Sequence, residues 1–124
     1  MGMNRQRFIE RLNELGYSKS DYMILSGGSL LLRGLRDETA DIDLSISLRL
    51  ADKLDLEHIE KDEVGCFVPF EDVQLKADMD SRSFEEIDGF RCQTLQDILA
   101  LKRRLMRPKD IADIQKIEGF LNNL

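Results

Sequence analysis

The sequence predicts an α/β (α+β) fold, in which helices flank a small β-sheet. Residues 41–48, D-I-D-L-S-I-S-L, alternate polar and apolar side chains strictly, which is typical of a strand with one buried face. Asp88-Gly89 separates two strand-like segments, as in a two-residue hairpin turn. Near the N-terminus, apolar residues recur at helical spacing: Phe8, Ile9, Leu12 and Leu15. Strands and amphipathic helices are therefore both expected.

The first part of the chain predicts a helix, a strand and a short helix. The first helix covers residues 4–15 and ends at Gly16, because glycine readily adopts the left-handed conformation that closes a helix. Residues 18–21 form a turn, and the apolar run at residues 22–26 predicts a buried strand. A short helix is expected over residues 29–35.

The middle of the chain predicts a surface helix and two strands. Residues 49–61 carry few apolar side chains among many charges, which favours a surface helix. Residues 64–70 are expected to form a strand, and residues 72–79 alternate again. The polar face of that last segment consists of Asp72, Gln74, Lys76 and Asp78.

The C-terminal part predicts a hairpin followed by two helices. Residues 84–87 pair with residues 90–94, and Thr94 can cap a helix that runs to about Met106. Pro108 opens a final helix at its first turn, where proline is tolerated. The expected buried stripe of that helix is Ile111, Ile114, Ile117 and Leu121.

Composition narrows the class of protein. The 124 residues are expected to form one domain, 1–124, with a single core. Neither a signal peptide nor a membrane-spanning run is evident, so we expect a cytoplasmic protein that does not contact a membrane. Cys66 and Cys92 lack metal-ligand spacing and are expected to be buried free thiols, although the sequence leaves a disulfide open.

Charge is unevenly distributed along the chain. The net charge of −6 argues against a general nucleic-acid coat protein. Five basic residues nevertheless cluster near the C-terminus: Lys102, Arg103, Arg104, Arg107 and Lys109. This cluster fits phosphate or RNA contact as well as it fits a solvated helix face.

The segment from Gly27 to Asp43 carries the clearest chemistry. Asp41 and Asp43 share one strand face about 7 Å apart, and adjacent carboxylates repel each other unless a cation neutralises them. Mg²⁺ prefers such oxygen ligands and shares substrate phosphates. Gly28 allows a ligand to approach the backbone closely, and Ser29 stands at or next to a helix start, which favours an anion. The segment predicts a nucleoside triphosphate (NTP) site with Mg²⁺; the alternative is a tight turn beside solvated charges.

Residues 27–44, G-G-S-L-L-L-R-G-L-R-D-E-T-A-D-I-D-L, resemble the signature of the nucleotidyltransferase superfamily, which has the DNA-polymerase-β-like fold. Lys102, followed by R-P-K-D-I-A-D at residues 107–113, is similar to the small prokaryotic branch that includes abortive-infection nucleotidyltransferase toxins. The resemblance implies a small mixed β-sheet with helices packed against it.

The resemblance also implies roles for individual residues. The nucleotide would be bound by Gly27, Gly28, Ser29 and Lys102. Asp41 and Asp43 would hold the metal ions and take part in catalysis. A third catalytic carboxylate usually lies on a neighbouring strand, where Asp78 is the first candidate and Asp72 the second. Lys76 or Gln74 could occupy that place instead, which would leave the metal site incomplete.

Lys102 is expected at the edge of a buried helical stripe. The stripe consists of Leu95, Ile98, Leu99 and Leu105. The stem of Lys102 could then lie along apolar surface while its ammonium group contacts phosphate. Arg103 and Arg104 would face solvent.

Two functions remain open at this point. The first is an Mg²⁺-dependent enzyme that transfers a nucleoside monophosphate from an NTP to a hydroxyl of RNA, a protein or a small molecule. The second is a catalytically inactive nucleotide-binding or partner-binding module, for example a toxin–antitoxin component that acts with a protein partner or as a homodimer.

Overall fold

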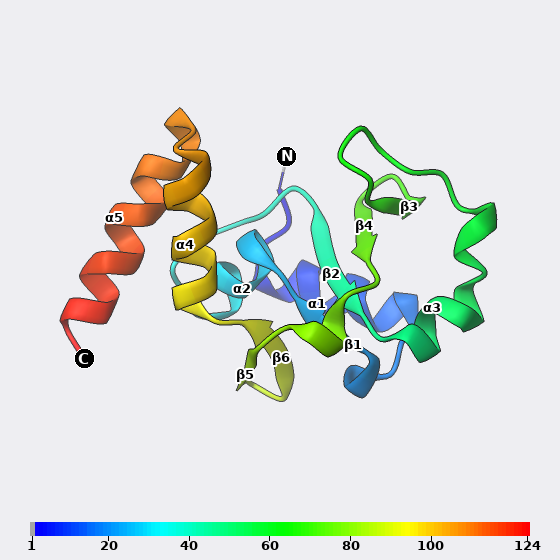
Figure 1. Ribbon diagram of the computed structural model, residues 1–124. Helices are drawn as coiled ribbons and strands as arrows, with labels where there is room; N and C mark the ends of the chain where they lie inside the picture. Colours follow the sequence, from blue (N-terminus) through cyan, green and yellow to red (C-terminus); the bar gives the residue numbers. More distant parts are fainter. Residues whose placement is uncertain (1) are drawn as a thin grey trace. The chain divides into compact units, whose positions relative to one another are not determined.

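The computed structural model describes residues 2–124 and contains five α-helices and a six-stranded mixed sheet (Figure 1). The predicted α/β (α+β) class is therefore confirmed. The chain divides into two compact units, Met1–Gln93 and Thr94–Leu124. The first unit contains the whole sheet and three of the helices, and the second contains the other two helices.

The sheet has the strand order β3-β4-β2-β1-β6-β5. Its strands are β1 (Tyr22–Ile24), β2 (Ile42–Ile46), β3 (Phe67–Phe70), β4 (Val73–Lys76), β5 (Phe84–Ile87) and β6 (Phe90–Gln93). The central β1 pairs antiparallel with β2 and parallel with β6, while β2 pairs parallel with β4. Each edge of the sheet is formed by an antiparallel strand: β3 pairs with β4, and β5 pairs with β6.

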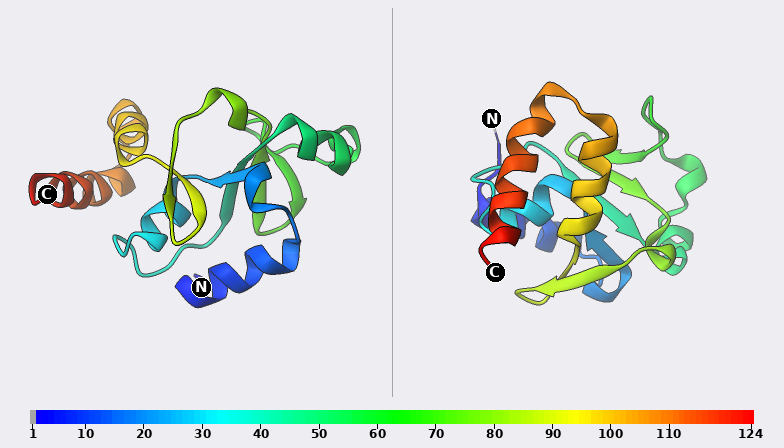
Figure 2. Two further views of the ribbon diagram at one scale, coloured as in Figure 1. Left: turned by 90° about the horizontal axis from the view of Figure 1, so that it is seen from below. Right: turned by 60° about the vertical axis from the view of Figure 1, so that its left-hand side comes forward.

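One face of the sheet carries the main core of the first unit. Figure 2 shows α1 (Arg5–Leu15) and α2 (Ser26–Leu32) on the same side of the strands. The predicted inward set of β2 is fully buried, because strict alternation sends every second side chain to the helices. The core includes Phe8, Leu12, Ile24, Leu31, Ile42, Leu44, Ile46, Val73 and Leu75.

The opposite face of the sheet is partly polar. Asp43 lies beside Gln74, and Ser45 lies beside Lys76, in the parallel register of β2 and β4. Residues paired in register project to the same face, so these four side chains form one polar strip. A small apolar cluster of Met23, Leu25 and Met79 is also buried in this unit.

The predicted hairpin is confirmed. Asp88 and Gly89 join β5 to β6 with φ values of 52° and 85°, and a two-residue loop with positive φ at both positions is the type I′ turn whose twist matches antiparallel strands. The first helix is also confirmed: the Asn4 side chain accepts a hydrogen bond from the Arg7 amide, and Gly16 closes the helix at φ 71°.

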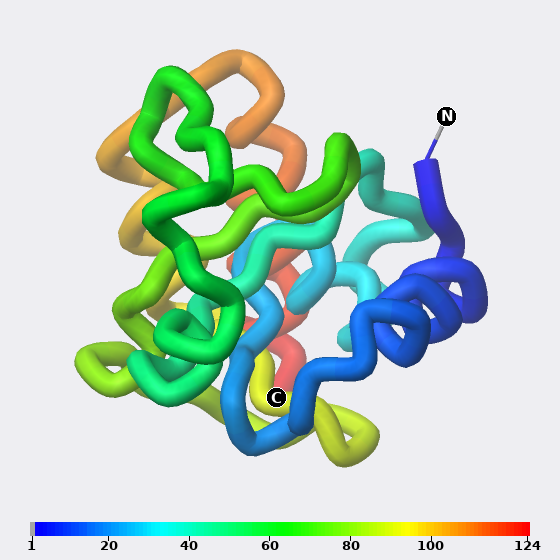
Figure 3. Tube along the Cα trace, turned by 90° about the vertical axis from the view of Figure 1, so that its right-hand side faces the viewer, coloured from blue at the N-terminus to red at the C-terminus, as the bar shows by residue number. Residues whose placement is uncertain are grey.

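The segment between α3 and β3, green in Figure 3, is less regular than the sequence predicts. Helix α3 covers only Leu48–Leu54, because Asp55 adopts a left-handed conformation and a single 3₁₀ turn, Leu56–His58, follows. Strand β3 begins at Phe67, and Val64 is exposed in the preceding loop. Cys66, in the same loop, and Cys92 are buried free thiols, as predicted.

The second unit is an α-helical hairpin of α4 (Leu95–Leu105) and α5 (Pro108–Asn122). The Thr94 hydroxyl caps α4 by accepting from the Asp97 amide at 3.1 Å, and Pro108 is the first residue of α5, as predicted. Two residues that were predicted to be buried are exposed instead: Leu105 is 45% exposed and Ile111 is 48% exposed.

The buried side of α5 differs from the predicted stripe. It consists of Asp110, Asp113 and Ile117, so two of its three members are carboxylates. The predicted stripe is therefore partly correct, since Ile117 is buried and Ile114 and Leu121 are half-buried, but counting only apolar residues missed the two buried carboxylates. Among residues 2–124, no helix has both the length and the apolar character needed to cross a membrane.

Candidate functional site

Asp43 is the centre of the candidate site. Its backbone is fixed in the sheet, where its carbonyl oxygen accepts a hydrogen bond from the Leu25 amide at 2.9 Å. Its side-chain Oδ1 is buried and has no hydrogen-bond partner among residues 2–124. An unsatisfied buried polar atom destabilises the folded state by about 1–3 kcal/mol. We therefore expect this oxygen to contact a water, an ion or a ligand from outside the chain.

The charges around Asp43 also affect how readily its carboxyl group ionises. Burial raises the pKa of the Asp43 carboxyl group, and the neighbouring Asp41 raises it further. Lys76 acts in the opposite direction. Without a bound cation, the Asp43 carboxyl group ionises less readily than a free carboxyl group, whereas a bound cation would favour its charged form.

Asp43 lines a pocket of about 160 Å³ on the polar face of the first unit. The lining consists of Leu25, Ser26, Asp43, Leu44, Val64, Cys66, Gln74 and Lys76. Sites for drug-sized ligands usually measure about 300–1,000 Å³. This pocket therefore suits one part of a ligand, such as a phosphate group with its cation.

The glycine segment differs from the prediction in one respect. Helix α2 begins at Ser26 rather than Ser29, so Gly27 and Gly28 belong to its first turn instead of a turn before it. Ser26 stands at the junction with φ 42° and donates its amide to Gln93 Oε1 at 2.9 Å. The amides of a first helical turn have no acceptor inside the helix, and Ser26 brings this end of α2 into the lining of the pocket.

Gly28 is required by core packing. A Cβ atom at this position would lie 2.5 Å from Phe8 Cζ and 2.6 Å from Ile24 Cγ2, both in fully buried side chains. A Cβ atom on Gly27 would meet the ends of two polar side chains, Arg36 Nη1 at 2.6 Å and Thr39 Oγ1 at 2.8 Å. The close approach at Gly28 is thus made by the core.

Ser29 is fully buried within the first unit. Its hydroxyl donates to the Gln93 carbonyl oxygen at 2.9 Å and therefore ties α2 to the end of β6. Arg33 reaches the same carbonyl at 3.1 Å and pairs with Glu85 at 3.5 Å. Ser29 does not line the Asp43 pocket.

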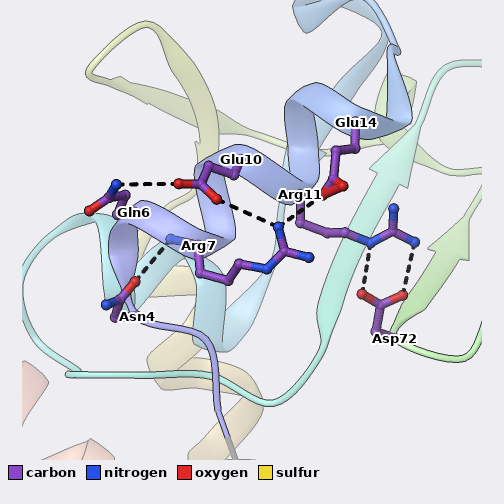
Figure 4. A network of polar contacts seen from close by, with 7 residues as sticks. All are labelled: Asn4, Gln6, Arg7, Glu10, Arg11, Glu14 and Asp72. Atoms are coloured by element: carbon purple, nitrogen blue, oxygen red, sulfur yellow. Dashed lines mark hydrogen bonds and ion pairs between the residues drawn. The ribbon is translucent and has the colours of Figure 1, made fainter.

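Asp72, one candidate for a third carboxylate, is already paired. Figure 4 shows its two oxygens facing the guanidinium group of Arg11 on α1, with N–O distances of 2.9 and 3.2 Å. The hydrogen bonds from Arg11 hold the pKa of Asp72 below its ordinary value. This bidentate pair connects α1 to the start of β4.

Asp78, the other candidate, follows β4. Its Oδ1 accepts hydrogen bonds from the Ser45 hydroxyl and from Arg82 Nε, the latter at 3.0 Å. Burial raises the pKa of Asp78, but these two donors outweigh burial and the pKa is lowered. The residue directly beside Asp43 on β4 is Gln74.

The donor set suits one cation shared with a ligand. Mg²⁺ is commonly bound by one or two carboxylates together with waters and substrate phosphates. The unsatisfied Asp43 oxygen fits that pattern, whereas Asp41 is exposed, directly precedes β2 and does not line the pocket. Within residues 2–124, no three side chains of the usual ligand types form a metal cluster by themselves. A second ion would have to be held by Asp78, whose carboxylate is engaged by Ser45 and Arg82.

Lys102 belongs to the second unit, where it is buried in an ion cluster. Its Nζ lies 3.2 Å from Asp110 Oδ1 and 3.1 Å from Asp113 Oδ2. Arg107 adds a contact of 2.7 Å to Asp110 and donates its own amide to the same carboxylate. Arg107, and after it Lys102, hold the pKa of Asp110 far below its ordinary value. Within this unit the charge of Lys102 is neutralised by two carboxylates, while Arg103 and Arg104 are exposed.

Nothing in the sequence indicated that Ser26 or Cys66 lines the pocket. Cys66 is placed by the loop before β3, where Asp62 Oδ1 accepts hydrogen bonds from the amides of Val64 and Cys66 at 3.0 and 2.9 Å. An aspartate two residues before such an amide is a recurrent turn signal, which could have identified the loop but not its position over Asp43.

No family model, no curated protein and no solved structure matches this chain in the comparisons made with each. The assignment of function therefore depends on the geometry of the site.

Proposed function

We propose that the first unit is a metal-dependent nucleotidyltransferase. In this proposal Asp41 and Asp43 hold Mg²⁺, and the polyphosphate of an NTP completes the coordination. The reaction transfers a nucleoside monophosphate to an acceptor hydroxyl and releases pyrophosphate. The observation that carries the proposal is the buried, unpartnered Oδ1 of Asp43 in a pocket beside the start of α2.

Three features support a metal-bound polyphosphate as the ligand. Burial raises the pKa of the Asp43 carboxyl group, and a bound cation would favour its charged form. The pocket of about 160 Å³ suits a phosphate group with its cation. Ser26 holds a left-handed backbone conformation there, and such conformations are frequent at functional sites. The acceptor hydroxyl could belong to RNA, a protein or a small molecule, and a cytoplasmic location fits the two free thiols.

One observation favours a second candidate. Gln74 lies beside Asp43, and the carboxylates of Asp72 and Asp78 are engaged elsewhere. An arrangement with only two metal-binding carboxylates could bind a nucleotide without transferring it. The second candidate is therefore a non-catalytic nucleotide-binding module, such as the component of a toxin–antitoxin pair, that acts with a protein partner or as a homodimer.

A single set of reactions separates the two candidates. The wild-type protein is incubated with each α-³²P-labelled NTP, Mg²⁺ and, in turn, total RNA, protein or no acceptor. Transferred label and pyrophosphate are then measured. An enzyme gives both signals, and Asp43→Asn reduces the rate at least about 100-fold, the scale of losing one main electrostatic contact to the transition state. NTP binding without either signal favours the binding module, and absence of NTP binding contradicts both candidates.

A further inference from the structure

Lys76 is the basic side chain that the structure brings to the Asp43 pocket. It ends β4 and pairs in register with Ser45, two residues along β2 from Asp43. Alternation therefore sends Lys76 and Asp43 to the same face of the sheet. Both line the same pocket.

The positive charge of Lys76 is not neutralised by a carboxylate of the described residues. Its side chain is exposed, and among residues 2–124 it makes no ion pair. Several arginines of the first unit have carboxylate partners, for example Arg11 with Asp72, Arg33 with Glu85, and Arg82 with Asp78, but none of these three lines the Asp43 pocket. The charge of Lys76 nevertheless acts on Asp43, Cys66 and Asp78: it offsets part of the rise that burial causes in the pKa of Asp43 and Cys66, and it contributes to the lowered pKa of Asp78.

A pocket with one carboxylate and one ammonium group selects its ligand by charge. An anion alone would be repelled by Asp43, and a cation alone would be repelled by Lys76. A metal ion carried by a polyphosphate satisfies both groups, since the metal faces the carboxylate and a phosphate oxygen faces the ammonium group.

We infer that Lys76 is the phosphate-binding residue of this pocket, where its ammonium group contacts the polyphosphate whose cation is held by Asp43. This inference rests on the proposed function for the identity of the ligand as a nucleotide. It assigns to Lys76 the contact that sequence reasoning assigned to Lys102, whose ammonium group is paired with Asp110 and Asp113.

The test measures binding of inorganic tripolyphosphate and of ATP by calorimetry, each with Mg²⁺ and with EDTA. The variants are Lys76→Gln, Lys76→Arg and Asp43→Asn. Lys53→Gln is the matched control, because Lys53 is an exposed lysine on α3 and does not line the pocket. Protection of Cys66 from a small alkylating reagent locates the ligand, with the fully buried Cys92 as the internal reference.

Lys76→Gln should weaken tripolyphosphate and ATP about tenfold or more, with and without Mg²⁺, as expected for loss of a charge-assisted hydrogen bond. Lys76→Arg should retain most of the affinity, and Lys53→Gln all of it. Ligand should slow alkylation of Cys66 in the wild type and not in Lys76→Gln.

Equal affinities of Lys76→Gln and Lys53→Gln would overturn the inference, as would a wild type that binds neither ligand. Asp43→Asn separates this inference from the proposed function, because it should remove the gain in affinity from Mg²⁺ and improve binding in EDTA. If Asp43→Asn leaves the Mg²⁺ effect intact while Lys76→Gln loses affinity, the proposed metal site fails and the role of Lys76 stands.

Discussion

Asp43 of the first unit and Asp110 of the second are both carboxylates with buried oxygens, yet their surroundings are opposite. Asp110 is contacted by Lys102 and by the side chain and amide of Arg107, which hold its pKa far below the ordinary value. Asp43 has an oxygen without a hydrogen-bond partner in the part of the chain that the structure describes, and burial raises the pKa of its carboxyl group. Both sit on regular elements, so the difference lies in the partners that the chain provides.

In the proposed function, this contrast separates a structural carboxylate, Asp110, from a ligand-binding one, Asp43. A fully paired buried charge has no capacity to bind anything further, whereas an unpaired one stays unfavourable until something binds. The same contrast applies to Lys102, which is buried between two carboxylates, and Lys76, which is exposed at the pocket. For both signs of charge, the partners within the fold indicate where a ligand is expected.

The largest effect on stability is expected from a substitution at Asp110, the fully paired carboxylate. Asp110→Asn should reduce the free energy of unfolding by about 3 kcal/mol, because it removes one partner from a buried ion cluster. The pKa of Asp110 is lowered in the folded state, so its contribution is present above the unfolded carboxyl pKa of about 3.9 and is lost as the pH falls. Urea unfolding at pH 7 and pH 3 measures both effects.

The control for this variant is Arg103→Gln. It breaks the exposed pair with Glu118, at 2.6 Å, in the same helical hairpin. Exposed ion pairs contribute about 0–1 kcal/mol. Equal losses in the two variants would show that the Lys102 cluster does not stabilise the hairpin.

A smaller loss is expected from disturbing the scaffold beneath Asp43. Gly28→Val should destabilise the protein by about 1–3 kcal/mol, because the new side chain overlaps Phe8 and Ile24 in a packed core. Gly119→Ala on α5 is the counterpart, since a Cβ atom there meets nothing within 4 Å; it should stabilise by up to about 1 kcal/mol through helix propensity. Thermal unfolding of both variants tests the assignment, and a Gly28→Val protein as stable as the wild type would contradict it.

Local patterns were sufficient to predict most of the fold. The alternation of residues 41–48 placed Ile42, Leu44 and Ile46 in the core, and Asp88-Gly89 located the hairpin, because both signals depend on neighbouring residues alone. The C-terminal cap of α1 at Gly16 and the N-terminal cap of α4 at Thr94 followed in the same way.

Contacts between distant segments were not predictable from such patterns. The burial of Lys102 depends on Asp110 and Asp113 lying one turn apart on a helix that folds back on α4. The role of Gly28 depends on Phe8, which is distant in the sequence. The sequence predicted Asp43 as a site residue, and the structure adds that its Oδ1 has no hydrogen-bond partner among residues 2–124, whereas the carboxylates of Asp72 and Asp78 are engaged.

The effect on stability of neutralising Asp43 is the smallest and the most informative. Since the pKa of Asp43 is raised in the folded state, the wild type loses stability as the pH rises through that pKa. Asp43→Asn should therefore be more stable than the wild type by about 1 kcal/mol at pH 7. The difference should vanish below the unfolded carboxyl pKa of about 3.9.

The most direct test is thermal unfolding of the wild type and Asp43→Asn at pH 7, in EDTA and in Mg²⁺ with ATP. In EDTA the variant should unfold at the higher temperature. With ligand at about 100 times its dissociation constant, the wild type should gain about 2.7 kcal/mol, and Asp43→Asn should gain much less. A variant that is less stable than the wild type in EDTA, and that gains as much from Mg²⁺ and ATP, would contradict the conclusion that Asp43 is held ready for a cation.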